Sequence, residues 1–294
     1  MLIPRPKRTH YFTPLRYPGG KTFMFEFFDQ VIRQNRLRHV VYVEPFAGGA
    51  GAGLSLLLLE KVEQIVINDL DRAVYAFWRS VLDDGPAFID RVRMTPISMD
   101  EWRRQRETFR DPKAPAFDLG FAAFYLNRTN HSGILTGGPI GGISQTGAYK
   151  LGARFNKDEL IKRLRLITRY RDRIEVRNED GQAVIDRYAS NPTSFQYIDP
   201  PYFAKGGSLY MSFYKPEDHR RLAEQLNTLA NANWILSYDN VKEIQMLYAE
   251  RKTRFEFSLH YQAHTSRMGS ELVVLSDALH LPASMTEPAT LTLL

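Results

Sequence analysis

The sequence predicts an α/β protein in which a Rossmann-like, mostly parallel sheet is interrupted by a mostly helical insertion. Three observations predict this fold. A strand, a glycine-rich turn, a helix and a second strand follow one another in residues 39–69. Strand–helix alternation resumes after residue 172, and residues 76–171 between these parts carry helical periodicity. We therefore expect a sheet domain in two parts, 1–75 and 172–294, around an insertion at 76–171.

The first part reads as a helix followed by a βαβ unit. Residues 21–35 repeat apolar side chains at helical spacing, which predicts an amphipathic helix. HVVYVE (39–44) and QIVIND (64–69) are short apolar runs rich in β-branched residues, as in buried strands. The glycine-rich turn PFAGGAGAG and the helical run LSLLLLE lie between them. A unit of this length predicts two parallel strands.

The insertion is helical at first and then rich in Gly, Ser and Thr. Residues 71–127 have helical periodicity, whereas 128–156 read as a long loop, which in a compact domain is usually functional or disordered. Residues 76–171 contain 17 Lys and Arg against 10 Asp and Glu, a net charge of +7 in a chain of +6. This concentration of positive charge predicts a polyanionic partner such as nucleic acid.

The last part alternates strands and helices. After a helix over 157–170, strands are expected at RIEVRN, TSFQYID, WILSYDN, RFEFSLH and ELVVLS. Helices are expected between them near 180–189, 216–230 and 241–249. These elements complete the predicted sheet.

The composition excludes several classes of chemistry. The chain has no cysteine, so disulfides, thiolate zinc sites and thiolate nucleophiles are excluded. Methylation of carbon-5 of cytosine is excluded with them, because that carbon must first be attacked by a thiolate. The seven histidines show no metal-ligand spacing, and we expect no metal. Residues 54–59 are too short an apolar run to cross a membrane, and 1–14 lack the apolar stretch of a secretory signal. We therefore expect a cytoplasmic protein.

The glycine-rich turn is the first candidate for a cofactor site. Glycines tolerate positive φ and let the backbone approach a ligand, and the carboxyl edge of such a sheet is where nucleotide-like cofactors bind. The spacing of these glycines matches neither the dinucleotide fingerprint nor a phosphate loop, so a tight strand-to-helix turn without a ligand remains an alternative. Asp69 ends the second strand at the position where a carboxylate binds ribose hydroxyls. Asp71 is the alternative, and Asp69 could instead cap the next helix.

The run Asp199-Pro200-Pro201-Tyr202 at the end of a predicted strand is the strongest signal. The two prolines fix φ and remove backbone donors. The Asp199 carboxylate and the Pro200 carbonyl thus give two acceptors that face one point, which suits the two hydrogens of an aromatic amine. Tyr202 supplies a flat face on which a base can stack. A Pro-Pro turn with an incidental Asp is the alternative.

Taken together, these motifs resemble the Dam-like DNA adenine-N6 methyltransferases over nearly the whole chain and in the family's order. The YPGGK segment (17–21) resembles the one that closes over the cofactor, EPFAGG its glycine loop, and DPPY its catalytic motif. YLNR (125–128) resembles the start of its DNA-recognition segment, and residues 217–219, 237–240 and 271–274 fit later motifs. The resemblance, with the motif reading, implies a cofactor site at Tyr17, Lys21, Glu44, Phe46, Gly48, Gly49, Asp69 and Asp199, and catalytic roles for Asp199, Pro200 and Tyr202.

DNA contacts are expected from the loop at 128–156. Its charged residues Arg128, Lys150 and Arg154 are candidates for the phosphates, and Arg128 and Asn130 for the base edges. After Asn127-Arg128 the sequence departs from the family pattern, so no target sequence can be carried over. The glycine loop also departs from the commoner F-x-G-x-G, which leaves open the glycines that contact the cofactor.

The resemblance implies a class I methyltransferase that transfers a methyl group from S-adenosylmethionine to the N6 amine of an adenine flipped out of duplex DNA. Transfer to the N4 amine of cytosine is the closest alternative, because both targets are exocyclic amines. RNA methylation and a DNA-binding protein with a decayed catalytic site are further alternatives. A nicotinamide-dependent oxidoreductase explains neither the DPPY motif nor the basic insertion. The sequence leaves open the recognition site, a cognate restriction endonuclease and the oligomeric state.

Overall fold

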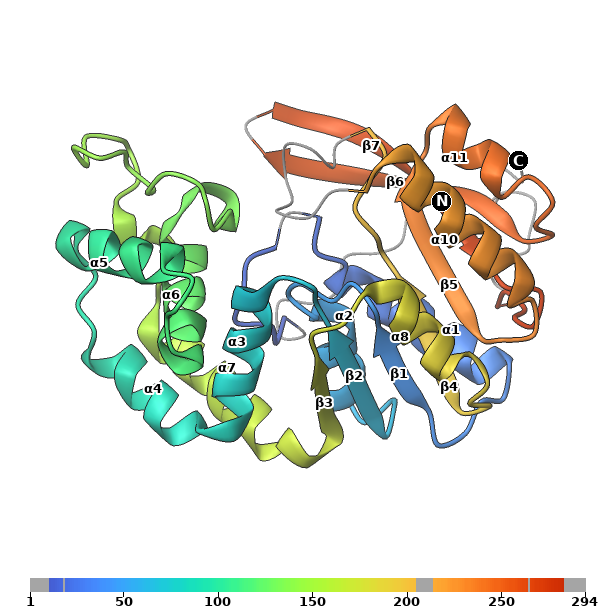
Figure 1. Cartoon of the computed structure of the whole chain (residues 1–294), viewed down its shortest axis with the longest axis horizontal. Helices are drawn as coiled ribbons and strands as arrows, with labels where there is room; N and C mark the ends of the chain where they lie inside the picture. Colours follow the sequence, from blue (N-terminus) through green and yellow to red (C-terminus); the bar gives the residue numbers. More distant parts are fainter. Residues whose placement is uncertain (1–10, 18, 205–213, 264, 283–294) are drawn as a thin grey trace.

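The computed structural model describes residues 11–17, 19–204, 214–263 and 265–282, which Figure 1 shows in colour. Pro18 of the YPGGK segment and residues 1–10 lie outside this described part. The described strands form one seven-stranded sheet in the order β3-β2-β1-β4-β5-β7-β6. The strands are β1 (Val41–Glu44), β2 (Gln64–Asn68), β3 (Ile174–Arg177), β4 (Ser194–Ile198), β5 (Trp234–Asp239), β6 (Arg254–Ala263) and β7 (Thr265–Leu275).

The strands from β3 to β5 are parallel, and β7 runs antiparallel to both of its neighbours, β5 and β6. The strand order reverses between β1 and β4: β2 and β3 follow on one side of β1, and β4 and β5 on the other. In open α/β sheets a crevice forms at such a point, outside the carboxyl ends of the strands. The prediction of a Rossmann-like α/β sheet is confirmed.

The period-two alternation of the strands divides the core between the two faces of the sheet. Side chains such as Tyr42, Ile65 and Phe195 face α1 (Phe25–Gln34) and α2 (Gly51–Leu58). Their neighbours along the strands face the helices of the opposite layer, seen in front of the sheet in Figure 1. That layer consists of α8 (Gly181–Ala189), α10 (Pro216–Thr228) and α11 (Lys242–Leu247).

The segment between β2 and β3 forms the helical lobe at the left of Figure 1. Its helices are α3 (Arg72–Asp83), α4 (Gly85–Met94), α5 (Met99–Arg110), α6 (Ala116–Thr129) and α7 (Lys157–Arg169), with short 3₁₀ turns η3 (His131–Gly133), η4 (Leu151–Arg154) and η5 (Arg171–Arg173). Polar side chains cap four helices: Asp71, Asp84, Ser98 and Asn156 each accept a backbone N–H of the first turn. The lobe shares one apolar cluster with the α1 face of the sheet, through residues such as Phe77, Phe88 and Trp102.

The boundary expected at residue 76 falls inside α3. The division of the chain into 1–75, 76–171 and 172–294 therefore stays a prediction. No helix of the described part is long and apolar enough to cross a membrane.

The hairpin of β6 and β7 is longer than the sequence predicts. The two strands pair over their whole length, whereas β5 pairs with β7 only from Glu271 to Leu275. The outer part of the hairpin thus projects beyond the carboxyl end of β5. It was not predicted because residues 261–270 show no apolar alternation in the sequence.

Candidate active site

A cavity of about 460 Å³ opens at the carboxyl edge of the sheet. Its walls come from the ends of β1, β2 and β4, from the chain between residues 11 and 22, and from residues 133–136 of the insertion. This volume lies within the range of small-molecule sites. The glycine-rich turn, Asp69 and the DPPY turn of the sequence therefore meet at one place.

The glycine loop forms one wall of the cavity, and hydrogen bonds from Asn68 at the end of β2 hold it in place. The buried Asn68 amide donates to the carbonyls of Pro45 (2.8 Å) and Glu179 (3.0 Å), which ties the loops after β1 and β3 to the end of β2. Gly48 has a φ of +48°, and a Cβ there would lie 2.6 Å from the ring of Tyr17. The side chain of Tyr17 therefore packs directly on the loop, where only glycine fits.

Two carboxylates stand in this cavity at the ends of β1 and β2. Glu44 Oε1 accepts the Tyr42 hydroxyl (2.9 Å) and the Gly53 N–H (3.0 Å), and burial raises the pKa of Glu44 to about 7. Asp69 accepts the N–H groups of Gly48 and Asp71, both at 2.9 Å, and burial raises its pKa to about 7 as well. Perturbed carboxylates in a cleft are typical of functional sites.

Asp71 is not in the same situation as Asp69. Its carboxylate caps α3 by accepting the N–H of Ala73 at 2.7 Å. The helix cap considered for Asp69 is thus supplied by Asp71, which leaves Asp69 at the cavity wall. Phe46 also lines the cavity, with its ring packed edge-on against Tyr214.

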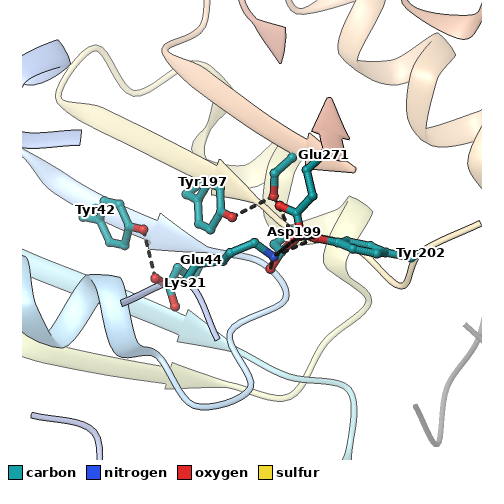
Figure 2. Close-up of polar contacts among 8 residues, drawn as sticks. Lys21, Tyr42, Glu44, Tyr197, Asp199, Tyr202 and Glu271 are labelled. Carbon is teal, nitrogen blue, oxygen red and sulfur yellow. Dashed lines mark hydrogen bonds and ion pairs between the residues drawn. The ribbon is translucent and has the colours of Figure 1, made fainter. Parts of the chain in front are cut away.

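Asp199 ends β4 and has two unequal oxygens (Figure 2). Oδ1 accepts hydrogen bonds from Ser237 Oγ at 2.8 Å and Lys21 Nζ at 3.1 Å. The Tyr202 hydroxyl lies 3.2 Å from the same oxygen, but its one hydrogen is shared with Glu271 Oε1 at 2.6 Å. Oδ2 accepts only Lys21 Nζ, at 3.0 Å, within the described residues. The side chain is 22% exposed and lines the cavity, so Oδ2 keeps acceptor capacity toward a ligand.

A buried ionic cluster surrounds this carboxylate. The ammonium group of Lys21 lies between Asp199 and Glu271, 3.4 Å from Glu271 Oε1. The Tyr202 hydroxyl lies 2.6 Å from both Lys21 Nζ and Glu271 Oε1. With both carboxylates ionised, two negative charges meet one positive charge. A site with a net negative charge stabilises positive charge that develops on a substrate.

The expected stacking of a base on Tyr202 stays a prediction. Its side chain is only 7% exposed, Tyr238 packs beside its ring, and Lys21 Nζ lies 5.1 Å above the ring centroid. Stacking of a base on this ring requires Lys21 to leave that face. The carbonyl of Pro200 accepts no hydrogen bond from the described residues, so its expected role as an acceptor stays a prediction.

The expected DNA contacts are separated by the structure. Asn130 is fully buried: its Oδ1 accepts Trp102 Nε1 (2.7 Å), and its Nδ2 donates to the carbonyls of Ile134 and Leu135. The expected contact of Asn130 with base edges stays a prediction, and it would require these internal hydrogen bonds to be exchanged. Arg128 is half-buried and donates to the Arg154 carbonyl, and its expected DNA contacts stay a prediction.

Lys150 and Arg154 are exposed, and their expected phosphate contacts stay a prediction. Lys150 donates to the Gln145 carbonyl at 2.7 Å, and the Arg154 guanidinium lies 5.8 Å from the Tyr149 ring centroid. Neither contact withdraws the charge from solvent.

Three residues of the site were given no functional role from the sequence. Ser237 donates to Asp199 and therefore accepts the hydrogen bond from the Tyr197 hydroxyl (2.7 Å), while Glu271 accepts the Tyr202 hydroxyl. Asp239 accepts the N–H groups of Phe203 (3.0 Å) and Ala204 (2.7 Å), and so fixes the backbone that follows the DPPY turn. Their motifs were noticed, but the neighbourhood of β4, β5 and β7 follows only from the strand order.

The sheet order, the glycine loop and the DPPY turn at one edge define a class I, Rossmann-like methyltransferase. A comparison with protein families matches residues 17–268 to the D12 class N6 adenine-specific DNA methyltransferases. The chain belongs to this family and is an adenine-specific DNA methyltransferase. Among solved structures, it is similar to the rRNA methyltransferase aviRa from Streptomyces viridochromogenes, with 16% sequence identity and a TM-score of 0.37. That alignment covers 87% of this chain and 85% of the other. A comparison with curated proteins found no match.

Proposed function

We propose that this enzyme binds S-adenosylmethionine in the cavity and methylates the N6 amine of an adenine that is flipped out of duplex DNA. The observation that carries the proposal is the open Oδ2 of Asp199. Asp199 lines the cavity, and within the described residues its Oδ2 accepts only Lys21, whereas Oδ1 accepts Ser237 and Lys21 and lies near the Tyr202 hydroxyl. The carboxylate is therefore held rigidly while it keeps one acceptor for an amine hydrogen.

The residues of the cavity fit the methyl donor. The Gly48 backbone provides a wall without a Cβ, and Asp69 offers carboxylate oxygens for two ribose hydroxyls. Glu44 offers a carboxylate to a cationic group, and Tyr17 and Phe46 add aromatic surface. When bound, S-adenosylmethionine supplies an electrophilic methyl group on a sulfonium.

Asp199 and the Pro200 carbonyl orient the amine, so that its nitrogen lone pair points out of the base plane. Asp199 need not be a strong base, because the amine becomes acidic only as it gains the methyl group. Lys21 balances one of the two carboxylates, and the remaining negative charge stabilises the nitrogen as it becomes positive. No covalent bond to the enzyme is needed, in keeping with a chain without cysteine.

The target base must leave the helix, because its N6 atom is not accessible in line while the base is stacked and paired. Unstacking costs a few kcal/mol, which contacts inside the cavity have to offset. The helical lobe, with exposed Lys150 and Arg154, supplies positive charge for the DNA backbone.

The experiment that tests this function is product analysis. The protein is incubated with methyl-labelled S-adenosylmethionine and unmethylated duplex DNA of mixed sequence, and the DNA is digested to nucleosides for mass spectrometry. We expect label in N6-methyladenine, and none with the Asp199→Ala variant. Label in N4-methylcytosine would overturn the choice of base, and undiminished label with Asp199→Ala would overturn the mechanism.

A further inference from the structure

Four arginines gather where the N-terminal segment crosses the helical lobe. Arg16 belongs to the segment 11–17, Arg128 to the last turn of α6, Arg154 to η4 and Arg163 to α7. Arg16, Arg128 and Arg163 are half-buried and Arg154 is exposed, so the group is partly open to solvent. We call these four residues the arginine cluster.

Hydrogen bonds to main-chain carbonyls hold the cluster together. Arg163 Nη1 donates to the Thr13 carbonyl at 2.8 Å, and Arg16 Nη1 to the Asn130 carbonyl at 3.2 Å. Arg128 Nη2 donates to the carbonyl of Arg154. The buried Asn127 amide binds both the N–H and the carbonyl of Arg16, each at 2.7 Å. The N-terminal segment and the lobe thus bring these side chains to one place.

Within the part of the chain that the structure describes, no ion pair balances the positive charges of the cluster. None of the four makes a salt bridge with a carboxylate of the described residues. The charge of Glu159 acts on Arg163, but its carboxylate binds Lys162 at 2.8 Å. Arg128 Nε is buried and has no hydrogen-bond partner in the described part of the chain. Such an unsatisfied donor is unusual in a folded protein.

The effect on Arg128 shows how closely the four guanidinium groups act on one another. Burial lowers the pKa of Arg128 to about 9, together with the like charges of Arg16, Arg163 and Arg154. At neutral pH the group is still protonated. Guanidinium groups that repel one another in a half-buried position are stabilised when an anion joins them.

The arginine cluster lies next to the catalytic cavity. Thr13, Leu15 and Tyr17, the near neighbours of Arg16 in the sequence, line that cavity. Arg16, between them, instead contacts the lobe. A group bound at the arginine cluster is therefore a close neighbour of the substrate in the cavity.

We propose that the arginine cluster binds a backbone phosphate of the substrate DNA beside the cavity. This proposal rests on the proposed function, since the DNA must present a flipped base to the cavity. Guanidinium groups match the geometry of a phosphate and form charge-assisted hydrogen bonds with it. Arg16 and Arg163 thereby become DNA-binding residues in addition to Arg128 and Arg154, with phosphate rather than base edges as their target.

The test is the salt dependence of DNA binding by the full chain. Binding of a fluorescent duplex is measured by anisotropy over a range of NaCl concentrations, for the wild type and for the double variant Arg16→Gln/Arg163→Gln. Glutamine keeps a donor for each carbonyl but removes the charge. Arg165→Gln is the matched control, because Arg165 is exposed on the same helix α7. Arg154→Gln tests the cluster at its exposed member if the double variant does not fold.

We expect the slope of log affinity against log salt to fall by about 1 in the double variant and to stay unchanged in the control. One phosphate contact is worth a slope of about 0.9, so affinity at 0.1 M salt falls about eightfold relative to 1 M salt. Unchanged slopes in both the folded double variant and Arg154→Gln would overturn the proposal. Stabilisation of the wild type by millimolar inorganic phosphate, with unchanged DNA slopes, would identify a site for free phosphate instead.

The outcome is independent of catalysis, because binding is measured without turnover. An enzyme that bound DNA through the cluster but formed no N6-methyladenine would contradict the proposed function and leave the phosphate site standing. An active enzyme whose salt slopes stayed unchanged in the variants would support the proposed function and contradict the phosphate site.

Discussion

Replacing Glu44 by glutamine should stabilise the fold and weaken binding of the methyl donor. Both hydrogen bonds of Glu44, from Tyr42 and Gly53, end on the same oxygen, Oε1. Glutamine can keep both with its amide oxygen, so the change removes the buried charge alone. Burial raises the pKa of Glu44 from 4.5 to about 7, and the ionised group therefore opposes folding.

The size of the effect follows from the pKa change. A carboxylate whose pKa is raised in the folded state gives full stability below its unfolded pKa and loses it as the pH rises through the folded pKa. With about 1.4 kcal/mol for each pKa unit, Glu44→Gln should be more stable than the wild type by about 3 kcal/mol at pH 8. The advantage should fall below about 1 kcal/mol at pH 5, where Glu44 is protonated in the folded protein.

Urea unfolding at both pH values measures these differences. Glu224→Gln is the control, because Glu224 is exposed on α10, and its stability relative to the wild type should not change between the two pH values. Calorimetry at pH 8 should show weaker binding of S-adenosylmethionine to Glu44→Gln, by about tenfold, for loss of a charged hydrogen-bond acceptor. No gain in stability at pH 8, or a gain of equal size at pH 5, would refute the reasoning.

Two further predictions concern the support of the site. Ser237→Ala removes the shortest hydrogen bond to Asp199 Oδ1, and we expect kcat to fall about tenfold with KM for DNA unchanged; steady-state kinetics would contradict this if KM alone rose. Gly48→Ala should abolish measurable donor binding in calorimetry, because its Cβ would overlap the Tyr17 ring. Gly142→Ala is its control: φ is +76° there, but no atom lies within 4 Å, so only backbone strain is added and donor binding should persist.

Much of the fold was predictable because the strands that carry it are buried and local in sequence. The runs at 39–44, 64–69 and 193–199 are rich in apolar residues, and each forms a strand of the sheet core. The outer part of the β6–β7 hairpin was not predictable in this way. Its residues pair with each other and not with β5, and backbone pairing of this kind leaves no signal in the local sequence.

The candidate site was predictable where one segment carries the chemistry. The DPPY turn and Asp69 each follow a strand directly, and the carboxyl ends of parallel strands meet at one edge. The partners of Asp199 were not predictable, because Lys21, Ser237 and Glu271 come from three distant segments. The burial of Asn130 was missed for the same reason.

Asn130 illustrates why polar loop residues mislead. Its short polar side chain follows a helix and opens a glycine-rich loop, a context that favours an exposed position. In the structure Trp102 of α5 donates to it, and its own amide closes the turn at Ile134 and Leu135. These contacts depend on how α5 packs against α6, which local sequence does not encode.

The central claim is that Asp199 holds the target amine through its open oxygen. It is tested most directly by the single-turnover rate of Asp199→Asn, with methyl donor and duplex DNA both saturating. We predict that the rate falls about 10²- to 10³-fold, the usual effect of losing one preorganised charged group, while the Kd values for donor and DNA stay within about threefold. A rate within tenfold of the wild type, with both ligands bound, would contradict the account.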